Sequence, residues 1–355
     1  MACSVFSTSS TQAKYVYSNG TNYNPMSPPT SYGSSEYSAI LSKKNHIILG
    51  ITPYQTFTFT KEINAYTENG GYYLLSVPVG EVAPEEVEHM LDNNYDLYAF
   101  DESQELEWVI YKTDSFDLEA GKGYLYANSA DVILALTSSP YNGNGQVTLN
   151  KTGDAETAGW NLVGNPFNHT AYLDRDFYVM NDDGSEIVAA DRNYVDVMEG
   201  VFVVAESDGE TLTFSMTAPA KSPRLVLNLS GGPSTGSGTA IIDRAIIRFA
   251  EGRMLPKLQI KESSSKLYIQ QDGKDYAVVN SGNVGEIHVG FKVEQSGTYT
   301  LNFSNENVGF SYLHLIDTLT GVDVDLLEMP SYSFKVNMTD KTERFKLEYA
   351  TKREE

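Results

Sequence analysis

The sequence of 355 residues contains a single cysteine, Cys3. An internal disulfide is therefore excluded, and burial of apolar side chains together with hydrogen bonds between strands must stabilise the fold. Basic residues are also scarce: 25 Lys and Arg stand against 47 Asp and Glu, which leaves a formal net charge of −22. A surface of this sign repels phosphate backbones and anionic lipid, so neither nucleic acid nor direct membrane insertion is expected.

Long apolar runs and catalytic motifs are missing too. No stretch approaches the roughly 18 consecutive apolar residues of a membrane helix, and no secretory signal stands at the N-terminus, so any export signal would lie outside this chain. No Gly-x-Ser-x-Gly elbow accompanies a strand-to-helix turn, and no Cys–His nucleophile set exists. No catalytic or cofactor-binding residue is predicted. A glycan-active hydrolase with paired carboxylates is the least favoured function, because the acidic residues lie in turns where a solvated face explains them.

Aromatic residues and turn formers are abundant instead. The chain has 24 Tyr and 15 Phe, whose side chains fit a pleated, half-buried surface better than a helix. Its 28 Gly and 13 Pro separate short apolar runs, a pattern that predicts an all-β protein of antiparallel sheets. One short helix is expected at residues 83–91, where Pro84 suits a first helical turn and Val87, Met90 and Leu91 would dock on a sheet.

Three blocks of sequence recur in the same order, which indicates an internal duplication. Each copy has a glycine-led strand that ends at a proline, a strand opened by Asp and followed by an acidic turn, and a second glycine-led strand. The spacing between equivalent blocks shrinks along the chain, as deletions in loops would produce. The paired blocks are Gly71–Val79 and Gly159–Phe167, Asp96–Phe100 and Asp176–Met180, and Gly123–Ala127 and Gly200–Val204.

Composition and turn signals divide the chain into three parts. Residues 1–45, rich in Ser, Thr, Asn and Gly, are expected to be a linker or the end of a preceding module. Residues 46–218 would form the duplicated β-sandwich domain, and residues 224–350 a second sandwich or jelly roll. Pro219 and Pro223 mark a linker between these two consecutive domains, which would allow limited motion.

A series of motifs carries a resemblance to a known family. The motifs are GWNLVGNPF at Gly159–Phe167, LEAGKGYLYA at Leu118–Ala127, QDGKDYAVV at Gln271–Val279, and three further segments at Tyr312–Asp317, Thr320–Leu327 and Pro330–Phe334. Together they resemble the C-terminal β-module region of large secreted or outer-surface proteins of Bacteroidota, many associated with type IX secretion. The resemblance implies an extracellular or outer-membrane-surface location and paired β-modules. It implies no catalytic residues.

Two groups of residues are candidates for binding. Trp108, Tyr111, Tyr124 and Tyr126 would form an exposed aromatic strip for a glycan, although burial in a core is the commoner fate of such residues. Asp182, Asp183 and Glu186, in the turn Asn181–Glu186, offer oxygen ligands for calcium. Their spacing does not match a helix-loop-helix calcium loop, and Asp183-Gly184 between strands is typical of a hairpin turn.

No other metal or cofactor is indicated. The five histidines are scattered, and none pairs at i, i+2 or i, i+4, so a transition-metal site is not expected. The favoured function is a non-catalytic structural and adhesive module, with glycan binding by exposed aromatics as the alternative. Glycans or other surface proteins would be the partners, and the sequence leaves the oligomeric state open.

Overall fold

The computed structural model describes residues 56–352 except residues 69, 91–93, 154–156, 233–239, 259–264 and 341. Before residue 56 it describes only the backbone of β1 (Ser4–Val5), β2 (Tyr15–Val16), β3 (Tyr37–Ile40) and β4 (Leu49–Ile51). Cys3, Leu91 and most of the predicted linker 1–45 lie outside the described residues. Strands make up the rest of the regular structure apart from one short turn of 3-10 helix, so the predicted all-β class is confirmed.

Unit 1 is the first of two similar units and contains eight strands. A four-stranded antiparallel sheet has the order β6-β11-β8-β9, and two further pairs, β5–β12 and β7–β10, complete the unit. Its core lies between the four-stranded sheet and the β5–β12 pair. The strands are β5 (Phe57–Ile63), β6 (Tyr73–Leu75), β7 (Glu81–Val82), β8 (Tyr95–Phe100), β9 (Trp108–Ile110), β10 (Leu118–Glu119), β11 (Tyr124–Asn128) and β12 (Val132–Ser138).

Unit 2 repeats this arrangement strand for strand. Its four-stranded sheet has the order β14-β19-β16-β17, and the pairs β13–β20 and β15–β18 correspond to β5–β12 and β7–β10. It encloses a core of its own. The predicted duplication is thus confirmed, and it extends to every pairing. The strands are β13 (Gln146–Leu149), β14 (Trp160–Gly164), β15 (Ala171–Tyr172), β16 (Tyr178–Met180), β17 (Ile187–Ala189), β18 (Tyr194–Val195), β19 (Gly200–Val204) and β20 (Glu210–Thr213).

The two units meet around an approximate two-fold axis. Leu75 of unit 1 bridges to Glu199 of unit 2, and Lys122 bridges to Val163. These bridges are equivalent, because Val163 is the repeat counterpart of Leu75 and Glu199 that of Lys122. The strand contacts also come in equivalent pairs: β6 lies against β16 and β19, while β14 lies against β8 and β11.

The glycine at the start of β11 in unit 1 and of β19 in unit 2 is required by this contact. A Cβ at Gly123 would lie 2.6 Å from the carbonyl oxygen of Val163, and a Cβ at Gly200 would lie 2.8 Å from that of Leu75. Both distances are too short for a side chain, so the backbones of the two units approach closely only because glycine is present in both copies.

The helix predicted at residues 83–91 is wrong as an α-helix. Only Pro84–Glu86 forms a 3-10 turn, η1, and Val87 is already extended, with φ −94° and ψ 123°. The amide of Glu88 then donates to the carbonyl oxygen of Ala135 in β12 at 2.8 Å, which diverts the chain into a bridge with the sheet. Val87 and Met90 nevertheless pack in the core of unit 1, so the expected docking on the sheet is present.

The second domain wraps one eleven-stranded sheet around a single core. The order is β29-β28-β31-β26-β24-β25-β22-β21-β27-β30, with β23 paired to β25; all pairs are antiparallel except β22 with β25. The strands are β21 (Arg224–Gly232), β22 (Ile241–Arg248), β23 (Leu255–Pro256), β24 (Lys266–Gln271), β25 (Lys274–Asn280), β26 (Val284–Lys292), β27 (Gly297–Glu306), β28 (Phe310–Asp317), β29 (Val322–Asp325), β30 (Ser331–Val336) and β31 (Glu343–Thr351).

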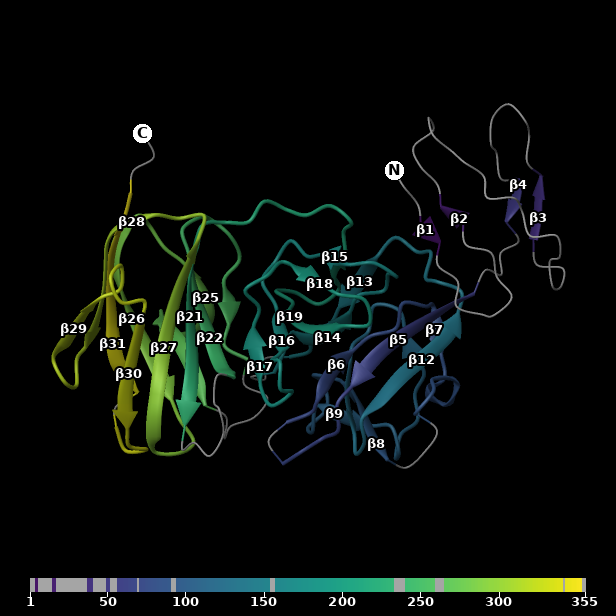
Figure 1. The fold of residues 1–355 in the computed structure, drawn as a ribbon, viewed down its shortest axis with the longest axis horizontal. Coiled ribbons are helices and arrows are strands. Elements are labelled where there is room, and N and C mark those ends of the chain that lie inside the picture. Colours follow the sequence, from purple (N-terminus) through teal and green to yellow (C-terminus); the bar gives the residue numbers. More distant parts are fainter. Residues whose placement is uncertain are drawn as a thin grey trace.

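Alternation along β27 shows how this sheet is specified. Tyr299, Leu301 and Phe303 are buried, while Asn302 and Ser304 between and after them are exposed. This period of two places every second side chain in the core. Unit 1, unit 2 and the second domain follow one another along the long axis of the molecule, with β5 near one end and β29 at the other (Figure 1).

Candidate functional site

Each four-stranded sheet of the first domain has an outward face of apolar side chains, opposite the face that packs in its own core. The repeat makes these outward faces equivalent, because alternation in the strands is preserved between the copies. In unit 1 the outward face carries Leu74, Tyr98, Phe100, Trp108 and Leu125, and in unit 2 it carries Leu162, Tyr178, Met180, Ile187 and Phe202. We call these the unit 1 face and the unit 2 face.

The second domain covers the unit 2 face. Val226, Ile246 and Val278 of the second domain belong to the same buried cluster as Trp160 and Tyr178 of unit 2. The two domains therefore share a continuous apolar core at their junction.

Tyr178 ties the two domains together through its hydroxyl. Its side chain is fully buried, and the hydroxyl donates to the carbonyl oxygen of Pro256 at 3.0 Å and accepts from the amide of Leu258 at 3.0 Å. Burial raises the pKa of Tyr178 well above its ordinary value, so the hydroxyl stays a donor.

A buried ion pair lies beside this tyrosine. Lys257 and Asp243 form a salt bridge, and their side chains are only 3% and 4% exposed. The carboxylate of Asp243 also accepts from the amides of Leu267 at 2.6 Å and Arg244 at 2.7 Å. Burial lowers the pKa of Lys257 and raises that of Asp243, and their mutual attraction opposes both shifts. Either charge alone would be unfavourable in this buried site, and the attraction between the two groups offsets that cost.

Arg244 adds a direct hydrogen bond across the junction. Its Nη1 donates to the carbonyl oxygen of Ala189 in β17 at 2.6 Å, and its Nε donates to the side chain of Asn228 at 2.7 Å. The guanidinium also lies 3.3 Å from Asp191 of unit 2. Polar contacts therefore fix the orientation of the second domain on the unit 2 face.

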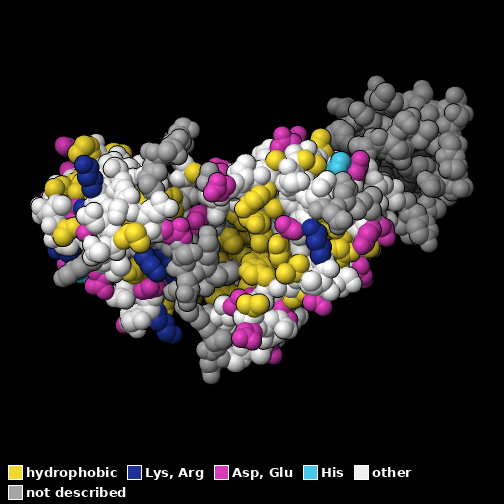
Figure 2. Space-filling model, turned by 90° about the horizontal axis from the view of Figure 1, so that it is seen from below, with side chains coloured by type: hydrophobic (Ala, Val, Ile, Leu, Met, Phe, Trp, Pro, Cys, Tyr) yellow, Lys and Arg dark blue, Asp and Glu magenta, His cyan; other side chains and the backbone are white. Residues whose placement is uncertain are grey.

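The unit 1 face is only half covered. Tyr98, Phe100, Trp108 and Leu125 are partly buried, and Ile110 at the edge of the sheet is 42% exposed. Figure 2 shows apolar side chains gathered in a hollow on this side of the molecule. The unit 2 face is thus covered by the second domain, while residues of the unit 1 face that pack at the edge of the same cluster stay partly exposed.

Trp108 is the one predicted ligand-binding residue on the unit 1 face. Its ring lies edge-on to Phe100, at 5.3 Å between centroids, and to Phe202 of unit 2, at 6.1 Å. Tyr98, at 6.3 Å, is the nearest other aromatic ring on the same face. The indole is therefore supported by other rings on this face, while part of its surface stays exposed.

The other three residues of the predicted strip do not join it. Tyr124 and Tyr126 are 2% and 0% exposed and pack in the core of unit 1, so neither ring is open to a ligand. Alternation in β11 turns both inward, and Leu125 between them takes the outward position. Tyr111 is partly buried against the same core and donates its hydroxyl to Glu85, a bond that raises the pKa of Tyr111 to about 12.

Tyr98 and Phe100 are the aromatic residues beside Trp108 on this face. Their alternation within Tyr95–Phe100 carries the signal, but the pairing of Tyr98 with Ile110 and of Phe100 with Trp108 requires the strand register, which composition does not supply.

The oxygen-rich turn joins the two units. The amide of Gly71 donates to the carbonyl oxygen of Asp183 at 2.8 Å, and the amide of Tyr72 donates to that of Gly184 at 3.0 Å. Gly184 has φ +71°, and a Cβ there would lie 2.5 Å from the carbonyl oxygen of Tyr72, so only glycine fits. The equivalent turn of unit 1 also crosses to unit 2, where Glu102 accepts from the amides of Thr152 and Gly159.

The side-chain oxygens of Asn181 and Asp183 in this turn already have partners. Asn181 Oδ1 accepts from the amides of Ser185 and Glu186 at 2.9 and 3.1 Å, and Asp183 accepts from the amide and hydroxyl of Ser185. Asp182 is exposed and Glu186 is partly buried. Among the residues that the structure describes, no three His, Cys, Asp or Glu side chains are grouped as metal ligands.

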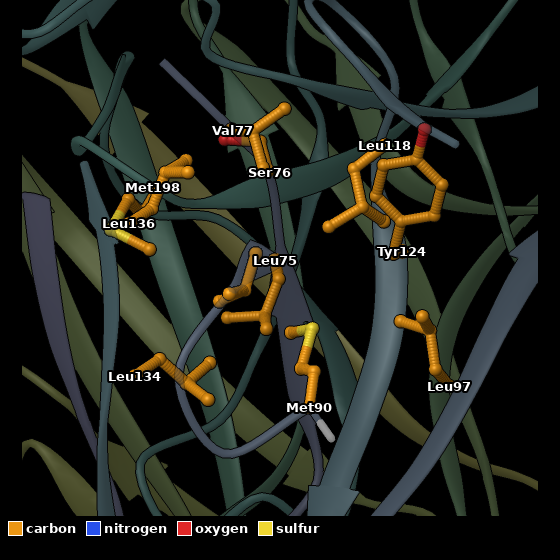
Figure 3. A pocket seen from close by; sticks show the side chains of 11 residues that line it. Leu75, Ser76, Val77, Met90, Leu97, Leu118, Tyr124, Leu134, Leu136 and Met198 are labelled. Atoms are coloured by element: carbon orange, nitrogen blue, oxygen red, sulfur yellow. The ribbon is translucent and has the colours of Figure 1, made fainter. Parts of the chain in front are cut away.

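A small internal void lies in the core of unit 1 (Figure 3). It has a volume of about 10 Å³ and is lined almost entirely by apolar side chains, including Leu75, Met90, Leu134 and Leu136. The hydroxyl of Ser76 donates to the carbonyl oxygen of Asn165 at 3.1 Å. A void of this size and polarity is a packing defect that stays dry, and it holds no ligand.

Within the described ranges, no helix is long and apolar enough to cross a membrane. Comparisons of the chain with models of protein families, with curated proteins and with solved structures found no match.

Proposed function

We propose that the chain is a rigid, non-catalytic β-rich module that holds other parts of a bacterial cell-surface or secreted protein at a fixed separation. One observation carries this proposal: the two domains share a buried core at their junction, reinforced by the Lys257–Asp243 pair. Because β5 and β29 lie near opposite ends of the long axis, such a junction would transmit position and force along the molecule (Figure 1).

The linker at residues 219–223 supports the same reading. Pro219 accepts a hydrogen bond from the side chain of Asn193 in unit 2 at 3.3 Å, and Pro223 accepts one from the amide of Phe249 in the second domain at 2.8 Å. A linker bonded to both domains, above a shared core, favours a fixed angle over a hinge. The extracellular or outer-surface location rests on the motif series that resembles surface proteins of Bacteroidota.

Single-molecule energy transfer tests the rigidity. With Cys3→Ser removing the native thiol, dyes at Glu62→Cys in β5 and Lys335→Cys in β30 would report across the junction, since both residues are exposed. We expect a single distribution of transfer efficiency, no wider than that of a control dye pair within the second domain at Lys274→Cys and Lys335→Cys. A distribution that is broad or has two maxima would show a hinge and contradict the proposal.

Glycan binding by the unit 1 face is the second candidate function, favoured by the partly exposed Trp108 ring beside Tyr98 and Phe100. Screening on a glycan array should give signals that Trp108→Ala weakens by about tenfold or more, equivalent to about 1.4 kcal/mol. Tyr124→Phe is the matched control, because it changes a buried aromatic of the same unit and should leave the signals unchanged. An array with no signal for the unaltered protein would reject this function.

A further inference from the structure

Five basic side chains gather where the linker passes between unit 2 and the second domain. They line a cleft with about 120 Å³ of free space, together with Asp174, Asp176 and Glu251. Unit 2, the linker and the second domain all contribute, so the cleft exists only because the two domains are docked. We call it the arginine cleft; its basic residues are Arg175, Lys221, Arg224, Arg248 and Arg253.

Buried positive charge in the arginine cleft exceeds buried negative charge. Arg224 and Arg248 share one carboxylate, Asp176, and these three side chains are 7–9% exposed. Arg175 and Arg253 share a second carboxylate, Glu210, at 2.8 and 2.7 Å. Four guanidinium groups thus share two carboxylates, of which Asp176 is 9% exposed and Glu210 15%.

The remaining acids near the cleft are exposed. Asp174 and Glu206, which also contact Arg175 and Arg253, are 77% and 67% exposed, so solvent screens their charge. Glu251 on the rim is exposed as well. Lys221 pairs with Glu306 at the outer edge. The cations that solvent screens least are therefore Arg175, Arg224 and Arg248, whose side chains are 7–9% exposed.

Arg224 has unused hydrogen-bonding capacity at this position. Its side chain is 7% exposed, yet its nearest carboxylate oxygen, on Asp176, is 3.7 Å away, and its only hydrogen bond to the described residues is a long one of 3.4 Å to the carbonyl oxygen of Ser222. Arg344 in the same domain makes three bonds of 2.6–2.8 Å. The N–H groups of Arg224 are therefore able to donate to a group inside the cleft.

We propose that the arginine cleft binds a small oxyanion, a sulfate, phosphate or carboxylate group, with Arg224 as the principal contact. The planar fork of a guanidinium matches such groups, and Arg248, Arg175 and Arg253 supply the surrounding positive potential. The free space suits a group of this size and excludes a bulky ligand body, which would remain outside. Since both domains contribute contacts, binding would also tighten their junction.

Calorimetric titration with inorganic phosphate and with inorganic sulfate, at constant ionic strength, tests the site. We expect saturable binding, with affinity at least tenfold weaker in Arg224→Gln and unchanged in Lys346→Gln, which removes a cation of the same domain away from the cleft. The absence of saturable binding at about 10 mM of either ion, or equal affinity in Arg224→Gln and the unaltered protein, would overturn the proposal.

A second variant covers the case in which Arg224→Gln does not fold. Lys221 is 39% exposed at the rim, so Lys221→Gln should fold normally and bind the ions on the order of threefold more weakly, as loss of an exposed charge predicts. Unchanged binding in Lys221→Gln would place the ion elsewhere. Comparison of inorganic sulfate with a sulfated monosaccharide identifies the source: tighter binding of the sugar indicates a group carried on a larger molecule, and equal binding indicates the free ion.

Discussion

Replacing Lys257 with Met is expected to lower the free energy of unfolding by about 3–5 kcal/mol. The change leaves Asp243, 4% exposed, as an unpaired charge at the domain junction. Differential scanning calorimetry measures the effect, and the transition that contains the junction should shift most. A shift no larger than that of an exposed-lysine variant would mean that the pair does not stabilise the junction.

A double variant separates the pair from its surroundings. Lys257→Met combined with Asp243→Asn removes both charges, while the single Asn side-chain oxygen still accepts from one of the two amides that Asp243 bonds. Most of the lost stability should return, because the cost of the single change comes from the charge left behind. If the double variant is as unstable as the sum of the single variants, the two charges are not coupled.

Replacing Arg344 with Met should have an effect of similar size, about 3–5 kcal/mol, on the second domain. Arg344 donates to both oxygens of Asp317, at 2.8 and 2.6 Å, and to the carbonyl oxygen of Lys335 at 2.8 Å. The two side chains are 3% and 1% exposed. Urea unfolding measures the loss. Lys346→Ala is the control, since its partners Glu286 and Glu348 are more exposed and such a pair contributes about 0–1 kcal/mol.

The same pair predicts a pH dependence. Burial alone would raise the pKa of Asp317, but hydrogen bonds from Arg344, Thr320 and Tyr332 lower it from an ordinary 3.8 to about 2. A depressed folded-state pKa gives stability that is complete above about pH 4 and is lost as the pH falls towards 2, with a total of about 2 kcal/mol. In Arg344→Met this part of the pH dependence should disappear; a profile as steep as that of the unaltered protein would contradict the assignment.

The sequence contained enough to predict the fold class and the duplication. Alternation in strands such as Gly297–Glu306 reports burial directly, and the glycines at 123 and 200 recur because the same backbone contact occurs twice. The short helix was mistaken because the spacing of Val87 and Met90 suits both a helical turn and an irregular segment pressed on a sheet. The segment is extended after Val87, where the amide of Glu88 donates to the carbonyl oxygen of Ala135, a residue distant in the sequence.

The candidate sites were harder to predict, because each depends on contacts between distant residues. Tyr124 and Tyr126 alternate with Leu125 and therefore share one face of β11, but the sequence does not say which face of this strand is covered. Lys257 and Asp243 show no pattern that marks them as partners. The arginines of the cleft come from unit 2 and from the second domain, so only the docking of the domains brings them together.

The approximate two-fold relation between the units has a consequence for their origin. Equivalent backbone bridges and strand contacts join the two units, so two separate copies of a single unit could associate through the same contacts as a homodimer. Fusion of two such genes would then free each copy to change independently. A domain fused after the second copy could cover only one of the two equivalent faces. The aromatic residues on the other face would then remain without such a cover.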